Sequence, residues 1–408
     1  MTAMRRLNGV IFAMAVFSAM AGDFSLGGYV KNYTALIYPP KFEAPFGITT
    51  PELTGAANYR FNLKASYSPV DWLGVRASYD FIPQYTGAGM NFFQAQELND
   101  YRVADIPSRI SPADYEGEGF AIKQNLDRAM ISMRISFADI DIGRQAVAWG
   151  SARTVNPTDI LTPFSFDALD VEERPGVDGL RVRVPLGMMS EIDAGYLPGK
   201  DFEAENSAGW ANLKLYALET DVTLVLVGMR EFAFAGVDIA RAIRGAGTWL
   251  EFGYFGSHEF FTDGSDSDGD GYFRLTAGAD YSFTGKLYGF AEYHYSGAGE
   301  CSPRNYAENY SKSAFQRGGV FLNAQNYIIP GAFYQFTPLL TGSMSLIYNI
   351  CDNSALISPS IEHNFAQDVY ISAGAHIGFG KGGIDFPHVE SEFGSYPNMW
   401  FLSFRVYF

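Results

Sequence analysis

The residues best suited to acid–base or metal chemistry in this 408-residue chain are five histidines: His258, His294, His363, His376 and His388. None of them lies in a C-x-x-C-H haem motif or an H-E-x-x-H zinc motif, and none stands beside a serine in a nucleophile elbow. The 43 glycines are scattered, without the spacing of a phosphate-binding loop. The sequence therefore predicts neither an enzyme nor a required cofactor.

One acidic stretch has the residue types for a metal site. In DGSDSDGDG, residues 263–271, Asp266, Asp268 and Asp270 precede Gly271 and match the opening of an EF-hand-like calcium loop. The bidentate glutamate expected seven residues after the third aspartate is replaced by Ala277. Calcium binding and a plain solvated loop both remain open.

Basic residues recur at alternate positions of strand-like stretches. In residues 57–67, ANYRFNLKASY, apolar side chains alternate with polar ones. A period of two places the two sets on opposite faces of a strand. The polar face collects these cations: Arg60, Lys64, Arg76, Arg128, Arg134, Arg181 and Arg183. The same register brings acids such as Asp80, Asp141 and Asp193 opposite them. Two interpretations explain this pattern. The charges form solvated ion pairs that contribute about 0–1 kcal/mol each, or they set up an electric field across the pore that screens ions.

The elements that would position these charges are about 18 candidate strands of roughly nine to twelve residues, the length that spans a bilayer when tilted. Their connections alternate between tight turns and long loops. Lipid outside and water inside account for sheets with one apolar and one charged face. We therefore expect an all-β, closed antiparallel transmembrane β-barrel with short periplasmic turns and long extracellular loops.

The chain ends support export to the outer membrane. Residues 1–21 have a basic start, an apolar run and a small-x-small cleavage pattern, which predicts a signal peptide. Residues 22–408 would then form a single barrel domain, with outer-membrane lipid and lipopolysaccharide as partners. The formal charge of -16 argues against nucleic acid. A monomer, a homo-trimer and a periplasmic partner all remain open.

Arg144 breaks the alternation. Counting from Ile140 and Ile142 points it toward lipid, at a cost of roughly 2–4 kcal/mol near the midplane. A bulge at Gly143 would instead turn Arg144 into the lumen as a pore-lining cation. The same bulge would turn Val147 and Trp149 outward, Trp149 into the interfacial belt.

The stretch Gly143–Val184, which begins GRQAVAWGSARTVNPTD, is the most distinctive in the chain. It resembles porin-like barrels of the alginate-export type and related outer-membrane porins, as does Ser345–Asn364. The resemblance implies a barrel that passes small polar solutes or polyanions.

The connection 150–177 is expected to fold into the barrel and narrow it, because its apolar residues would be poorly placed in water. Its acids would then face the arginines of the early strands across the pore. These acids are Asp159, Asp167, Asp170, Glu172 and Glu173. An external lid is the alternative interpretation.

Cys301 and Cys351 are the two cysteines. Counting strands places them in neighbouring external connections, so we expect a disulfide between them; two free thiols are the alternative.

Taken together, these features predict a porin or channel for small polar or charged solutes. A barrel sheath around a periplasmic partner such as an electron-transfer cytochrome, and a substrate-specific polyanion exporter, are the alternatives. An outer-membrane hydrolase has less support.

Overall fold

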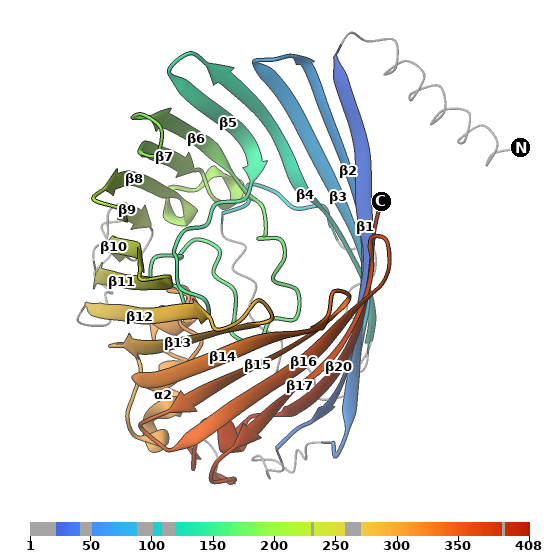
Figure 1. Cartoon of the computed structure of the whole chain (residues 1–408), viewed down its shortest axis with the longest axis vertical. Helices are drawn as coiled ribbons and strands as arrows, with labels where there is room; N and C mark the ends of the chain where they lie inside the picture. The colour runs from blue at the N-terminus through green and yellow to red at the C-terminus, as the bar shows by residue number, and fades with distance from the viewer. Residues whose placement is uncertain are drawn as a thin grey trace, which may run out of the picture.

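In the computed structural model, the chain forms an 18-stranded antiparallel sheet closed into a barrel, as Figure 1 shows. The structure describes residues 22–40, 51–87, 101–107, 119–229, 232–257, 271–385 and 388–408. Neighbours in sequence pair with each other, and β20 pairs with both β17 and β1, which closes the sheet. The expected closed barrel of about 18 strands is confirmed.

The strands of the barrel are β1 Asp23–Tyr38, β2 Thr54–Val70, β3 Leu73–Thr86, β4 Gly119–Ile135, β5 Ala138–Gln145, β6 Val177–Pro185, β7 Glu191–Leu197, β8 Ala208–Ala217, β9 Thr220–Met229, β10 Phe232–Ile243, β11 Ala246–Ser257, β12 Tyr272–Ser282, β13 Leu287–Ser296, β14 Asn326–Thr337, β15 Leu340–Asn349, β16 Ser354–Ala366, β17 Val369–Phe379 and β20 Asn398–Tyr407. A small hairpin, β18 Ile384–Asp385 with β19 His388–Val389, lies outside this sheet. Short helices α2 Tyr306–Asn309 and α3 Ser313–Gln316 lie between β13 and β14. No described helix is both long and apolar enough to span a membrane.

The two ends of the barrel differ in their connections. At one end, which we call the turn end, strands join through short turns such as 71–72 and 136–137. At the other, the loop end, connections include 39–53, 87–118, 146–176 and 297–325. Two loop-end connections, 230–231 and 350–353, are also short.

The two faces of the wall separate apolar from polar side chains. On β2, Tyr59, Phe61 and Leu63 are 45%, 42% and 50% exposed on the outside. The intervening Asn62 is 2% exposed and donates to Asp80 on β3 at 2.6 Å. Closure lets the backbone groups bond within the wall, so an apolar exterior and a charged interior can coexist.

Candidate functional site: a segment held across the lumen

Residues 146–176 connect β5 to β6 and run inside the barrel (Figure 1). We call this stretch the crossing segment. Its Ile160 and Leu161 are 1% and 0% exposed, and they pack in one cluster with Val177 and Trp210 of the wall. Burying these aliphatic side chains against the inner wall removes them from water, which favours the inward path.

Two wall carboxylates hold the first part of the crossing segment. Glu251 on β11 accepts hydrogen bonds from the backbone N–H groups of Ser151 and Ala152, at 2.7 and 2.6 Å, and from the Thr158 hydroxyl at 2.8 Å. Glu292 on β13 accepts the next two N–H groups, at 2.5 and 3.0 Å. Both glutamates are almost fully buried. Irregular backbone inside the barrel is thereby satisfied, as buried polar groups must be.

Cations of the opposite wall hold the last part of the segment. Lys31 on β1, which is fully buried, lies 3.0 Å from the Asp170 carboxylate and 2.7 Å from that of Glu172. Glu172 also pairs with Arg405 on β20. Burial disfavours the charged form of Glu172, yet the bonds from Lys31, Tyr407 and Arg405 lower its pKa to about 2. The segment is therefore fixed at both walls.

Most of the other basic residues expected to line the pore pair with acids of the wall or of the crossing segment. Arg60 lies 2.7 Å from Asp80 and 3.4 Å from Asp170, and Lys64 pairs with Glu173. Arg128 contacts Asp127 and the carbonyl of Arg174, while Arg181 and Arg183 bond Asp193 and Asp141 of neighbouring strands. Arg76 and Arg134 are exposed and form no ion pair with a described residue.

These contacts correct the expectation that the acids of the crossing segment would face the wall cations across the open pore. Asp170, Glu172 and Glu173 touch the wall cations directly and leave no gap across which to oppose them. Asp159 pairs at 2.6 Å with Arg174 of the same segment, and Asp167 accepts from Tyr396 at 2.6 Å. Partly desolvated charges gain most from direct contact, because an unpaired buried charge is costly.

The expected bulge at Gly143 is absent. The ladder with β4 continues without a shift through Gly143 and Arg144, and a bulge occurs instead at Asp127. Arg144 is 6% exposed, makes two bonds to Asp178 at 2.7 and 2.8 Å, and donates to the carbonyl of Ala104 at 2.6 Å. It is therefore enclosed by protein. The residues 101–107 that supply this cover come from the distant 87–118 connection.

Val147 and Trp149 turn inward, contrary to expectation. Val147 is fully buried in the cluster of the crossing segment, and Trp149 packs on Trp210 with ring centroids 5.7 Å apart. The sequence pattern misplaced both because the chain leaves the sheet at Gln145, after which strand alternation no longer applies.

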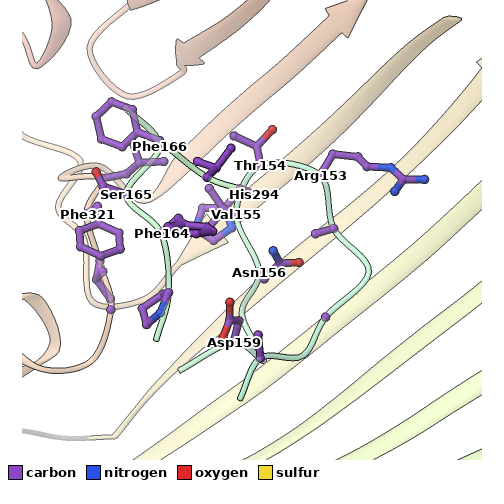
Figure 2. Close-up of a pocket in the computed structure, with 18 of the residues that line it drawn as sticks. Arg153, Thr154, Val155, Asn156, Asp159, Phe164, Ser165, Phe166, His294 and Phe321 are labelled. Atoms are coloured by element: carbon purple, nitrogen blue, oxygen red, sulfur yellow. The ribbon is translucent and has the colours of Figure 1, made fainter. Parts of the chain in front are cut away.

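A cavity of about 570 Å³ lies between the crossing segment and residues 319–322 of the β13–β14 connection (Figure 2). Phe164, Phe166 and Phe321 contribute aromatic surface to it. The Arg174 guanidinium lies over the Phe164 ring, 3.9 Å from its centroid. The cavity thus combines apolar rings with charged groups, as small-molecule sites commonly do.

The two buried histidines lie beside hydroxyl groups, and the described acids are not gathered into a metal-binding group. His294 and His376 are buried and bond hydroxyls, Thr276 at 2.8 Å and Ser358 at 2.7 Å. No group of three or more described His, Cys, Asp or Glu side chains is placed to hold a metal. Asp266, Asp268 and Asp270, together with the leader 1–21, lie outside the described residues.

Asp159 should make stability depend on pH. Burial raises its pKa to about 6, against the opposing effect of Arg174. A raised carboxyl pKa means that the folded state binds the proton more tightly than the unfolded state does. The stability that this proton contributes is therefore lost as pH rises from about 4 to 6. We expect Asp159→Asn to remove up to roughly 3 kcal/mol of that pH dependence, since one pKa unit is 1.36 kcal/mol.

The measurement is urea unfolding of both proteins in detergent at pH 4 and pH 7. Asp141→Asn, which alters a pair within the wall, is the control and should follow the wild type. Equal pH dependence in wild type and Asp159→Asn would contradict the assignment.

Cys301 and Cys351 form a disulfide with Cα atoms 4.9 Å apart, which ties the β13–β14 and β15–β16 connections. Nearby, the partly buried Glu392 carboxylate accepts from Tyr327 at 2.6 Å, Asn349 at 2.8 Å and the N–H of Asn323 at 2.7 Å. Sequence reasoning found the cysteines by strand counting, but no periodic signal pointed to Glu392.

Thiol titration checks the bridge. The unfolded, unreduced protein should show no reactive thiol, and reduction should release both cysteines. Two thiols before reduction would contradict the disulfide.

No protein-family model matches this chain, and no curated protein matches it. Among solved structures it is similar to the outer membrane protein OpdK of Pseudomonas aeruginosa, with 11% identity and a TM-score of 0.55 over 95% of this chain and 98% of the other. It is also similar to OccAB1 of Acinetobacter baumannii, with 12% identity and a TM-score of 0.54 over 94% and 96%. The chain therefore has a porin-like β-barrel fold of the outer-membrane type.

Proposed function

We propose that this protein is an outer-membrane channel for small polar or charged solutes, in which the crossing segment sets the narrowest part. The observation that carries the proposal is a closed barrel, apolar outside and charged inside, whose lumen is crossed by a segment fixed at both walls. A closed barrel with a polar interior is the architecture by which proteins carry water-filled pores through outer membranes.

The pairing of wall charges bears on selectivity. Arg60, Arg181 and Arg183 each lie within 3 Å of a wall carboxylate. Paired charges compensate each other's field, so we expect only modest discrimination between small anions and cations. A dedicated polyanion exporter would call for a run of uncompensated cations instead.

The alternative of a sheath around a periplasmic protein has less support. The crossing segment passes through the lumen and is bonded to both walls, so it occupies space that a folded partner would have to fill. The cavity of about 570 Å³ beside the segment has a size that suits a small solute.

Planar-bilayer recording with the full-length protein tests the proposal. Insertion should give stable steps of ohmic conductance, and reversal potentials in a salt gradient should show weak selectivity. Folded protein that inserts without conducting would overturn the channel.

Calcium binding by Asp266, Asp268 and Asp270 is a separate proposal, which rests on the spacing of these acids alone. Calorimetry with millimolar calcium that shows no heat would remove it.

A further inference from the structure

The cavity described above is a slot between two legs of the crossing segment. Residues 148–156 form the first leg and residues 163–174 the second, and side chains of both line the slot together with residues 319–322. Figure 2 shows the two legs side by side, with Arg153–Asn156 on one and Phe164–Phe166 on the other. A solute that enters the slot therefore touches side chains of both legs.

Three polar side-chain atoms at the slot have no hydrogen-bond partner of good geometry among the described residues. They are the Oδ1 atoms of Asn156 and Asp159 and the Nε atom of Arg274 on β12. Asp159 and Arg274 are only 1% and 2% exposed. Buried polar atoms in folded proteins are nearly always bonded, so three such atoms around one cavity indicate a further partner.

The charges of these groups restrict what that partner can be. Arg274 makes a single long contact, 3.5 Å to the carbonyl of Gly318, and Asp159 pairs through its other oxygen with Arg174 at 2.6 Å. An anion would face the Asn156 and Asp159 oxygens, and a cation would face both guanidinium groups. A neutral solute with several hydroxyls suits both sets, because each hydroxyl donates one hydrogen bond and accepts two.

Aromatic rings supply the apolar surface of the slot. Phe164, Phe166 and Phe321 line it and are half-buried. The face of an aromatic ring carries partial negative charge and attracts groups with partial positive charge at their edge. The C–H groups of a sugar ring are polarised in this sense by their neighbouring oxygens. The rings thus complement the part of such a solute that carries no hydroxyl.

We propose that the slot binds a small neutral polyhydroxylated solute of the size of a monosaccharide. The cavity of about 570 Å³ lies within the range of small-molecule sites. Because neighbouring side chains cover the three unpartnered atoms, entry of the solute has to part the two legs slightly. The inference deepens the channel function proposed above, since it names the class of solute that would be recognised at the crossing segment.

Calorimetry of the folded full-length protein in detergent tests the site with D-glucose as the probe and benzoate as a ring-shaped anion for comparison. We expect saturable heat with glucose and none with benzoate. Binding of benzoate in place of glucose would overturn the neutral class of solute. Heat from neither probe would overturn the site, and the cavity would then hold ordered water only.

Two variants test the residues. Arg274→Met removes every donor at nearly constant length and should weaken glucose binding roughly tenfold, whereas Asn156→Ala should weaken it about threefold, the effects of losing a charged and a neutral hydrogen bond. Asn364→Ala on β16, which lies outside the slot, is the matched control and should bind as the wild type does. Unchanged glucose binding in Asn156→Ala and in folded Arg274→Met would contradict the assignment.

The same measurements separate this inference from the channel itself. Protein that binds glucose in solution but does not conduct in a bilayer would keep the site and remove the channel. Protein that conducts but does not bind glucose would keep the channel and remove the site.

Discussion

Deleting residues 157–171 should raise single-channel conductance several-fold and weaken whatever ion selectivity the wild type has. The deletion removes Ile160 and Leu161, which are buried on the inner wall, and Asp170, which bonds Lys31. A narrow stretch dominates the resistance of a wider pore, so clearing it has a large effect. The barrel itself should persist, because its ladder closes without this segment.

The comparison variant replaces the same residues by a glycine–serine chain of equal length. It keeps the connection but lacks the side chains that hold it, so conductance should rise and become noisier. Removing residues 383–389, which lie outside the crossing segment, serves as control and should leave conductance near the wild-type value. If the deletion leaves conductance and selectivity unchanged, the crossing segment is not the constriction.

Replacing both Glu251 and Glu292 by alanine should release the first half of the crossing segment. The two carboxylates accept four backbone N–H groups at 3.0 Å or less, and the Thr158 hydroxyl. Leaving a buried donor without a partner costs about 1–3 kcal/mol. Summed over these donors, the lost free energy is large enough to detach this irregular part of the chain from the wall. We therefore expect a larger, fluctuating conductance and a lower unfolding temperature.

Asp141→Asn is the matched control, because Asp141 is a lumenal carboxylate that bonds Arg183 of the wall and leaves the crossing segment untouched. It should keep the wild-type conductance and noise. Wild-type current traces from the double variant would show that the two glutamates do not position the segment.

The sequence predicted the row of basic residues on the lumenal face of the early strands, but not the acidic residues that pair with them. Alternation placed Arg60 and Lys64 on the lumenal face of β2, where the structure has them. Lys31 on β1 lies opposite Arg60 in the register and was missed. Its role arises because Asp170 and Glu172, more than 100 residues later, fold back onto it.

Arg144 shows where pattern reasoning fails. A cation on the apolar face predicted a bulge that would rescue it locally. In the structure Arg144 instead bonds residues distant in the sequence, the Asp178 carboxylate on β6 and the backbone carbonyl of Ala104. Irregular connections lack the alternation of apolar and polar residues that marks a strand, so their sequence does not predict such a contact.

The sequence by itself determined the architecture, because a period of two and strand lengths suited to a bilayer are local properties repeated around the sheet. It also indicated which face is lumenal, that 150–177 enters the barrel, and that two cysteines lie near each other. Only the tertiary structure decided which charges touch, since ion pairs across the lumen depend on how an irregular segment crosses it. Closure likewise decided that the short strands β5, β6 and β7 stand side by side between longer strands, because the height of the wall is a property of the assembled sheet.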